Sequence, residues 1–199
     1  MPHWVIRLHE AADEVFWAAR LNLLWIAGTL AGGVVLGIGP ATLAAFAVAR
    51  ARSRNGHARF IAEYRREFRR GTTVVLPILV VAAALIVNYH YFDAVAAFAG
   101  ATATVAALAV LVVVASFALP MAVHYHVPAY ALLPKASLFA LTRPAPSALL
   151  LLVAVAVAYL SRVLPFLVPA ISVGGWIQLD TWLCLRFFAE NEARLRRGT

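Results

Sequence analysis

The chain has 199 residues, of which 63% are hydrophobic and 13% are charged, and its mean hydropathy is +0.84. Soluble domains carry about 45–50% apolar and about 25% charged residues, so this composition excludes a water-soluble globule. A helix that crosses a bilayer takes about 20 residues, which limits the chain to about six or seven crossings. We therefore predict an all-α, polytopic transmembrane helix bundle that forms a single membrane domain over residues 1–199.

The formal net charge of +8 is unevenly distributed along the chain. Residues 50–70 hold eight arginines and two glutamates, which supplies +6 of that total. Basic residues near the ends of spans stay in the cytoplasm, so this segment indicates a cytoplasmic loop. The single cysteine, Cys184, excludes an internal disulfide framework and gives no cysteine spacing typical of a metal site.

In chain order, the first predicted element is an amphipathic helix over residues 3–20. Its apolar residues recur on one helical face and its charged residues occupy the other. Such a helix lies in the interface of a membrane rather than across it. The segment lacks the uninterrupted apolar core of a signal peptide, so we expect no cleavable leader.

Residues 21–49 carry no charge and, as one straight helix, would rise about 43 Å against a hydrocarbon core of about 30 Å. We therefore predict a first span over residues 21–38 and a second helix with Pro40 at its first position. Small residues spaced four apart in this span favour close helix packing, and a flexible gate at residues 37–40 is the alternative. The residues of this motif are Gly28, Gly32, Gly33, Gly37 and Pro40.

A short amphipathic helix is predicted over residues 58–70. Aromatic residues recur at every fourth position, and arginines cover the rest of the helix. The arginines form either a surface for anionic lipid, at about 1 kcal/mol per basic residue, or, with the aromatic stripe, a surface for a protein partner. Nucleic acid is not expected, because these arginines lie against a membrane. The candidate binding residues are Phe60, Tyr64, Phe68, Arg65, Arg66 and Arg69.

Four further spans are predicted from apolar segments. They cover residues 72–92, 101–123, 147–167 and 171–189. The first two form a helical hairpin, joined by a tight turn that contains Asp93 and Gly100. With about five spans in total, the Arg-rich loop, the proline-punctuated loop at 124–146 and the C-terminal tail share one side. That side is predicted to be cytoplasmic and the N-terminus to lie outside.

Arg162 and Asp180 are charged residues placed well inside the predicted spans. Burial of a charge in hydrocarbon costs at least about 2.5–3.5 kcal/mol, so each of these residues is expected to have a functional or a structural role. Antiparallel packing of the last two spans would bring them together, with Gln178 nearby. The pair is either a polar site or hinge, or a structural pair that fixes helix register; an arginine that reaches the outer interface is a further structural alternative.

Sequence motifs of catalysis are absent from the chain. No Ser-His-Asp order, phosphate-binding glycine loop or His-Glu-x-x-His pattern occurs. His124 and His126 are two residues apart, so on a helix they face different sides, and no third ligand of the right type is nearby. We therefore expect neither an enzyme nor a metal or other cofactor.

Several helix-packing and loop motifs resemble those of the YesL-like family of bacterial membrane proteins. They are Leu21-Asn22-Leu-Leu-Trp25, Gly39-Pro40-Ala41-Thr42, the F-x3-Y-x3-F helix, Lys135-Ala136-Ser137-Leu138 and Phe187-Phe188. The resemblance covers most of the chain. It implies a protein of about five spans in the bacterial plasma membrane, from a family often encoded beside components of carbohydrate ABC transporters.

Two functions follow from these observations. The first is a non-enzymatic accessory or regulatory subunit that docks on the permease subunits of a carbohydrate ABC transporter. The alternative is a self-contained small-solute transporter or channel built on the intramembrane polar residues. A homo-oligomeric scaffold in the lipid bilayer, held together by the glycines of the first span, is a third interpretation.

Overall fold

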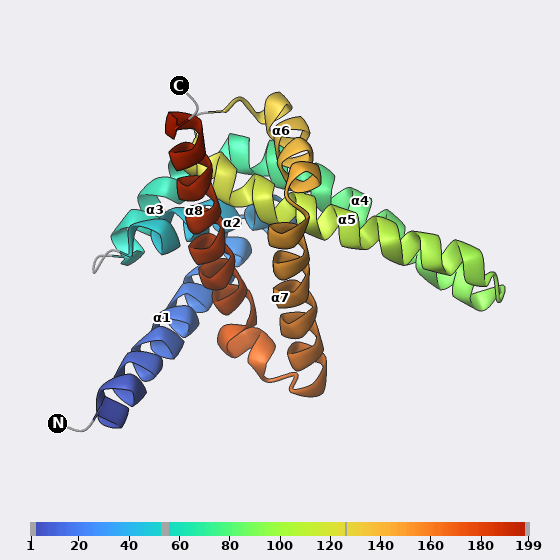
Figure 1. The fold of residues 1–199 in the computed structure, drawn as a ribbon. Coiled ribbons are helices and arrows are strands. Elements are labelled where there is room, and N and C mark those ends of the chain that lie inside the picture. The colour runs from blue at the N-terminus through green and yellow to red at the C-terminus, as the bar shows by residue number, and fades with distance from the viewer. Residues whose placement is uncertain (1–2, 53–55, 126, 198–199) are drawn as a thin grey trace.

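The computed structural model describes residues 3–52, 56–125 and 127–197, and this part of the chain is a set of packed helices (Figure 1). No strand occurs among the described residues, which confirms the predicted all-α class. The helices are, in chain order, α1 His3–Ala31, α2 Val35–Ala51, α3 Gly56–Arg66, α4 Phe68–Ala94, α5 Phe98–His124, α6 Ala129–Thr142, α7 Pro144–Val163, the short π-helix η1 Val168–Ser172 and α8 Val173–Arg197.

Three helices in the described part of the chain are long and apolar enough to cross a membrane, namely α4, α5 and α7. They correspond to the predicted spans at 72–92, 101–123 and 147–167, and with the composition they identify an integral membrane protein. The predicted span at 171–189 lies in α8, which is not among them. The reason is charge, because Asp180, Arg186 and Glu190 interrupt the apolar sequence of that helix.

The predicted first span is wrong, because the chain turns back within it. α1 runs without interruption from the amphipathic segment to Ala31, and α2 then packs against α1 as the second arm of a hairpin. The turn is made by Gly33, with φ of +72°, and Val34, with φ of +62°. Pro40, expected at the first helical position, lies inside α2. Proline has no backbone N–H, so the carbonyl of Leu36 lacks its usual helical donor. That carbonyl oxygen instead accepts a hydrogen bond from Thr72 Oγ1 of α4 at 3.3 Å.

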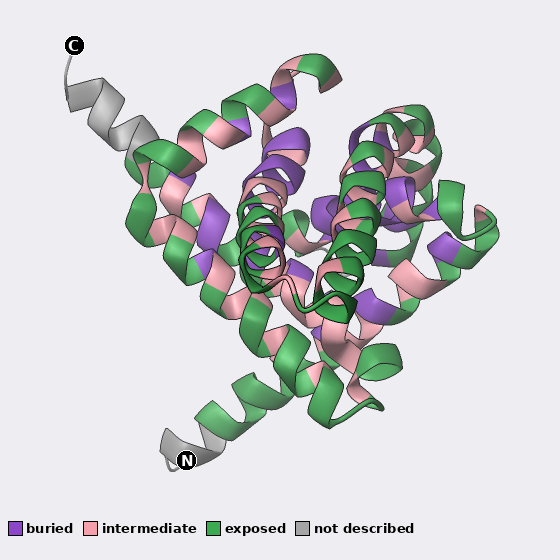
Figure 2. Cartoon of the chain, turned by 90° about the vertical axis from the view of Figure 1, so that its right-hand side faces the viewer, coloured by how far each residue is buried: buried purple, intermediate pink, exposed green. Residues whose placement is uncertain are grey.

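α2 is the central helix, in contact with α1, α3, α4, α5 and α8. Between Gly37 and Val48 nearly every residue is buried, and most of the side chains are small. Gly39 meets Gly71 of α4 backbone to backbone, which leaves no room for a Cβ on either. Figure 2 shows the buried residues gathered where the helices converge and the outlying helix ends exposed. The core is therefore organised around one helix whose small residues allow close approach from several sides.

α1 is also fastened to the start of α8. Asn22 is fully buried, and its Nδ2 donates to the carbonyls of Val168, at 3.2 Å, and Pro169, at 2.7 Å. Its Oδ1 accepts a hydrogen bond from the backbone N–H of Gly174 at 3.0 Å. One side chain thus bonds to backbone groups of both η1 and the first turn of α8, and so ties α1 to them.

The predicted helical hairpin is confirmed as α4 and α5, which extend together away from the rest of the molecule in Figure 1. The turn comprises residues 95–97, so Asp93 belongs to the last turn of α4 and Gly100 to the first turn of α5 rather than to the loop. A Cβ on Gly100 would overlap the ring of Phe92. Farther along the hairpin, Asn88 Nδ2 donates to Thr104 Oγ1 at 3.1 Å.

We expect Gly174→Ala to destabilise the protein while its neighbour Gly175→Ala does not. A Cβ on Gly174 would overlap the carbonyl oxygen of Ala18, whereas the nearest atom to a Cβ on Gly175 is 3.7 Å away. Overpacking costs about 1–3 kcal/mol, and an unhindered alanine in a helix gains about 0.5–1 kcal/mol over glycine. Thermal unfolding in mild detergent measures both; equal melting temperatures for the two variants would contradict the packing.

Candidate functional site

The basic segment folds as two helices rather than as the single predicted helix over residues 58–70. α3 ends at Arg66, α4 begins at Phe68, and Glu67 forms the bend. The bend costs few hydrogen bonds, because the N–H of Glu67 still bonds to the carbonyl of Glu63 at 2.8 Å. It redirects the chain so that Gly71 can pack on α2, a tertiary constraint that the periodicity of the segment does not contain.

The aromatic stripe of this segment points into the protein. Phe60 is 4% exposed, and a Cβ on Gly28 of α1 would lie 2.9 Å from its ring. The Tyr64 hydroxyl lies beside Gly32 in the same way. The rings of Phe60 and Tyr64 stack at 6.1 Å, and Phe68 meets Tyr64 edge-on at 5.7 Å. Phe60 and Tyr64 thus fasten α3 to the chain's own core, which contradicts the predicted role of these two rings in binding a partner.

Most of the predicted glycine motif has the packing role expected of it. Gly28 and Gly32 make room for the aromatic rings of α3, and Gly37 packs against the backbone of Thr29. Gly33 does not pack at all, because nothing lies within 4 Å of the position of its Cβ. Its role is conformational, since its positive φ allows the turn. No gate forms at residues 37–40, which lie within the continuous helix α2.

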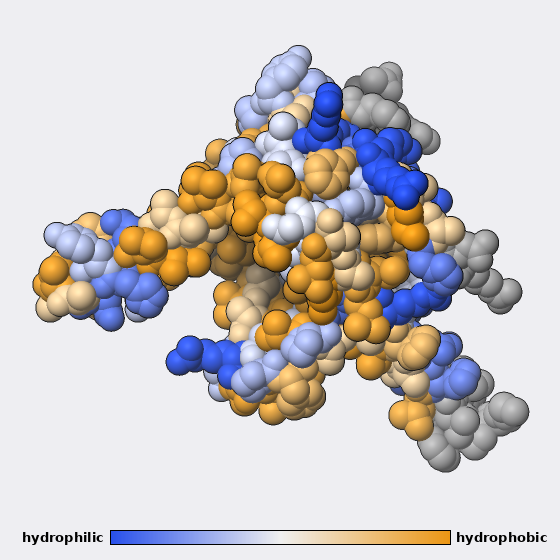
Figure 3. Space-filling view, turned by 180° about the vertical axis from the view of Figure 1, so that it is seen from behind, coloured by the Kyte–Doolittle hydropathy of each residue, from blue (hydrophilic) through white to orange (hydrophobic). Residues whose placement is uncertain are grey.

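The outward face of the segment is arginine-rich. Arg59 and Arg65 of α3 and Arg69 of α4 are exposed, and none of them forms an ion pair with another described residue. In Figure 3 strongly hydrophilic side chains gather on the side of the molecule where α3 and α8 lie, whereas apolar side chains cover the base of the α4–α5 hairpin. We call Arg59, Arg65 and Arg69 the arginine face.

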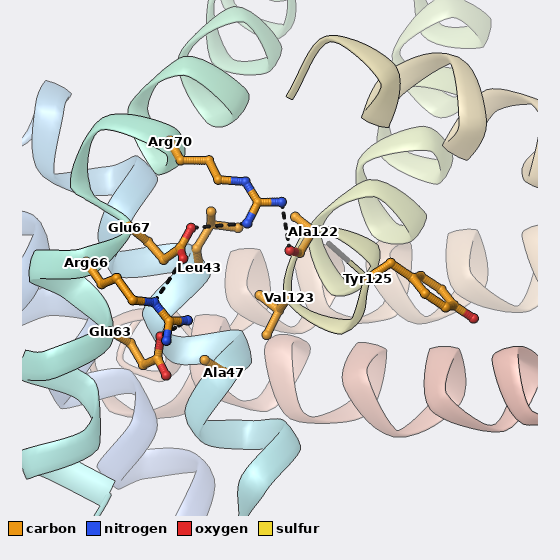
Figure 4. A pocket seen from close by; sticks show the side chains of 9 residues that line it. All are labelled: Leu43, Ala47, Glu63, Arg66, Glu67, Arg70, Ala122, Val123 and Tyr125. Carbon is orange, nitrogen blue, oxygen red and sulfur yellow. Dashed lines mark hydrogen bonds and ion pairs between the residues drawn. The ribbon is translucent and has the colours of Figure 1, made fainter. Parts of the chain in front are cut away.

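Behind the arginine face, charged side chains alternate in sign along the bend. Arg66 pairs with Glu63 at 2.6 Å and with Glu67 at 3.2 Å, and Arg70 pairs with the other oxygen of Glu67 at 3.3 Å. The glutamate side chains are only 12% and 15% exposed. They border a cavity of about 310 Å³, whose opposite wall includes Val123 of α5 (Figure 4).

This chain of ion pairs ends on the C-terminus of α5. Arg70 donates to the carbonyls of Ala122, at 3.1 Å, and Val127, at 2.8 Å, and Arg50 donates to the carbonyl of Val123 at 2.7 Å. The last four carbonyls of a helix lack intrahelical partners and carry the negative end of its dipole, so guanidinium groups stabilise them. The basic segment and the residues that follow α5 thus meet at one end of the bundle.

The C-terminal half of α8 reaches the same end. The ring of Phe188 stacks on His124 at 5.4 Å and contacts Phe139 of α6 at 5.7 Å. His126, considered above with His124 as a metal ligand, lies outside the described residues. Within the described ranges, no three His, Cys, Asp or Glu side chains gather where they could hold a metal ion.

The hypothesised pair of Arg162 and Asp180 is not formed. Arg162 is exposed near the end of α7, and Asp180 is 1% exposed on the inner face of α8. Gln178 faces α1 instead, where its Nε2 donates to Glu14, a residue that also pairs with Arg52. η1 lies in the connection between α7 and α8, and the acidic residue of α8 is buried in the core while Arg162 of α7 stays exposed.

Sequence reasoning did not distinguish Arg50 and Arg70 from the other arginines of the segment. Their function as caps of α5 depends on tertiary contacts with carbonyls that are 73 and 52 residues away in sequence. The two glutamates gave a usable signal, since Glu63 and Glu67 lie three residues before Arg66 and Arg70, a spacing that favours helical ion pairs.

We expect Phe60→Ala to detach α3, whereas Ile61→Ala leaves it in place. Phe60 is buried and Ile61 is 53% exposed on the same helix. Removal of a buried phenylalanine side chain costs about 3–5 kcal/mol. Hydrogen exchange of the α3 amides should accelerate strongly only in the first variant; slow exchange in Phe60→Ala would show that the stripe does not anchor the helix.

Alanine substitutions of the neighbours Arg69 and Arg70 should differ in their effect on the stability of the protein. Arg70→Ala removes charge-assisted hydrogen bonds to the end of α5 and is expected to cost about 1–3 kcal/mol. Arg69→Ala changes an exposed side chain and should stay within about 0.5 kcal/mol of the wild type. Thermal unfolding distinguishes them, and an equal loss in both variants would contradict the capping function.

Comparison with known proteins places the chain among proteins of unknown function. A family model described as "Protein of unknown function, DUF624" matches residues 18–89, which extend from the middle of α1 into α4. The chain is 30% identical over 195 residues to a protein of Bacillus subtilis (strain 168) described as "Uncharacterized protein YesV", with 94% of each chain covered. No solved structure matches. The molecule described above, an integral membrane protein built of helices, therefore belongs to the DUF624 family.

Proposed function

We propose that the chain is a non-enzymatic accessory subunit that docks on the permease subunits of a carbohydrate ABC transporter in the bacterial plasma membrane. The observation that supports the docking is the arginine face, which lies on α3 and the first turn of α4, with the stacked rings of Phe60, Tyr64 and Phe68 behind it. The class of transporter is supported by the resemblance to the YesL-like family described under Sequence analysis.

The arginine face has the properties of a docking surface. Its guanidinium groups have no ion-pair partner among the described residues, so they are available for carboxylates on another protein. Arginine is enriched among the residues that dominate binding energy at interfaces, and complementary charge accelerates association. Binding to this face costs little conformational entropy, because Phe60 already fixes α3 in place. The partner surface is therefore acidic.

A partner on α3 would act on the membrane helices through the alternating ion pairs. Arg66 bridges Glu63 of α3 and Glu67 at the bend, and Arg70 joins Glu67 to the end of α5. The ion pairs join guanidinium groups to largely buried carboxylates, and the last link joins Arg70 to the backbone carbonyl of Ala122. Because basic residues gather at this end of the bundle, its placement in the cytoplasm supports contact with the cytoplasmic side of a permease.

The test is a pull-down of the tagged protein from its native membrane in mild detergent, followed by mass spectrometry. Wild-type protein should recover ABC permease subunits. The variant Arg59→Gln, Arg65→Gln, Arg69→Gln should recover at least about tenfold less, since interface arginines each carry about 1 kcal/mol or more. Arg162→Gln is the matched control, because it removes an exposed arginine on α7. It should recover the partner like the wild type.

Two outcomes would overturn the proposal. Recovery of the wild-type protein without any permease subunit would exclude stable docking. Unchanged recovery by the triple glutamine variant would show that the arginine face does not make the contact. Alanine substitution of the aromatic stripe is not a suitable test, because Phe60 is part of the core and its loss would disrupt α3 itself.

A further inference from the structure

The inner face of α8 carries a buried carboxyl group without a partner. Asp180 is 1% exposed, and neither of its carboxyl oxygens accepts a hydrogen bond from any described residue. Its position on the helix is defined by contacts one turn to either side. Trp176 packs edge-on against Phe46 of α2 at 5.9 Å, and Cys184 reaches Ser116 of α5. Asp180 is therefore enclosed where α8 packs on the central helix and on a membrane-spanning helix.

The part of α5 next to this position is interrupted by a proline. Pro120 has no N–H, so the carbonyl of Ser116, four residues before it, loses its helical donor. Cys184 replaces that donor, with its Sγ 3.4 Å from the carbonyl oxygen. The hydroxyl of Ser116 is buried too and has no partner among the described residues. Such breaks in membrane helices are where proton and cation sites are commonly built.

No positive charge from the helices packed on α8 offsets Asp180. Between Val35 and Ala49, α2 carries no ionisable side chain, and α5 carries none from Phe98 to Val123. Arg50 and Arg52, at the end of α2, are engaged with Val123 and Glu14.

The ionisable groups that the other elements place near α8 are engaged elsewhere or exposed. On α1, Arg20 is hydrogen-bonded to His57, and Glu14 accepts a hydrogen bond from Gln178 and pairs with Arg52. On α7, Arg162 is exposed. Along α8 itself, Cys184 is one turn from the carboxyl group, and Arg186 lies over the ring of Trp182 at 3.8 Å.

We propose that Asp180 is a proton-binding site in the core of the bundle. An ionised carboxylate with neither counter-charge nor hydrogen bonds is one of the costliest groups to bury, and a bound proton removes that cost. A metal ion would need several ligands, and no suitable group of three gathers in the described chain. A proton needs no additional space, which suits a carboxyl group whose oxygens have no accessible surface.

Proton binding at this position is coupled to helix packing. The neutral acid fits between α8, α2 and α5, whereas release of the proton leaves a charge that those helices do not solvate. Folding therefore favours the protonated form, and the contribution of Asp180 to stability is lost as the pH rises through the range in which the folded protein releases the proton. This inference does not depend on the docking of a transporter.

The first test is an infrared pH titration of the full-length protein in detergent. Protonated carboxyl groups absorb separately from carboxylates. At neutral pH the wild type should show a protonated carboxyl band that Asp180→Asn lacks and that Asp180→Glu retains. Asp93→Asn, at the exposed end of α4, is the matched control and should keep the band. A band that is unchanged in Asp180→Asn, or that appears only in acid, would overturn the proposal.

The second test compares melting temperatures across pH. Asp180→Asn is close in shape and cannot ionise, so its stability should be less sensitive to alkaline pH than that of the wild type. The difference between the two curves should widen as the pH rises, because all other titrating groups are common to both proteins. Parallel curves would overturn the proposal. If the asparagine variant does not fold, the infrared titration of the wild type, Asp180→Glu and Asp93→Asn is the deciding test. A wild type without a protonated carboxyl band at neutral pH would also overturn the proposal.

Discussion

Close backbone contact with α2 is the interaction on which the arrangement of the other helices depends. Lipid tails are as apolar as leucine side chains, so burial of apolar surface gives membrane helices little reason to associate. Dispersion contacts at short range and hydrogen bonds have to supply the energy instead. The glycine contacts of α2 with α1, through Gly37, and with α4, through Gly39, bring the backbones close enough for both. α3, α5 and α8 then complete the shell around the same helix.

Two prolines contribute to this arrangement by freeing a carbonyl for a neighbouring helix. Pro40 frees the carbonyl of Leu36 for a hydroxyl of α4, and Pro120 frees that of Ser116 for the thiol of Cys184. In each case the lost intrahelical bond is replaced by a lateral one, as an environment without water requires. Pro40 thus allows a hydrogen bond between α2 and α4, and Pro120 allows one between α5 and α8.

How far the sequence predicts this molecule depends on the range of the interaction. The hairpin and α7 follow from long apolar segments, which are local, and were predicted within a few residues. The break before α2 is misplaced in the prediction because Pro40 is the stronger local signal, although the positive φ angles of Gly33 and Val34 reverse the chain. The periodicity of Phe60 and its neighbours identified an apolar face correctly. Whether that face meets lipid, a partner or the chain's own core depends on the glycines of α1, which no periodicity reveals. The same limit applies to Asp180, whose burial depends on how α8 packs on α2 and α5.

The hydrogen bonds that Asn22 of α1 makes to η1 and α8 have a consequence for biogenesis. The ribosome completes α1 first and α8 last, so the amide of Asn22 has no partner from η1 or α8 during most of synthesis. Contacts between distant segments also pay the largest loop-closure cost, which places them late in folding. Docking of α8 on α1 is therefore the step that closes the helix assembly. Until then the amide of Asn22 lacks these hydrogen bonds, and an unpaired polar group is costly in an apolar environment.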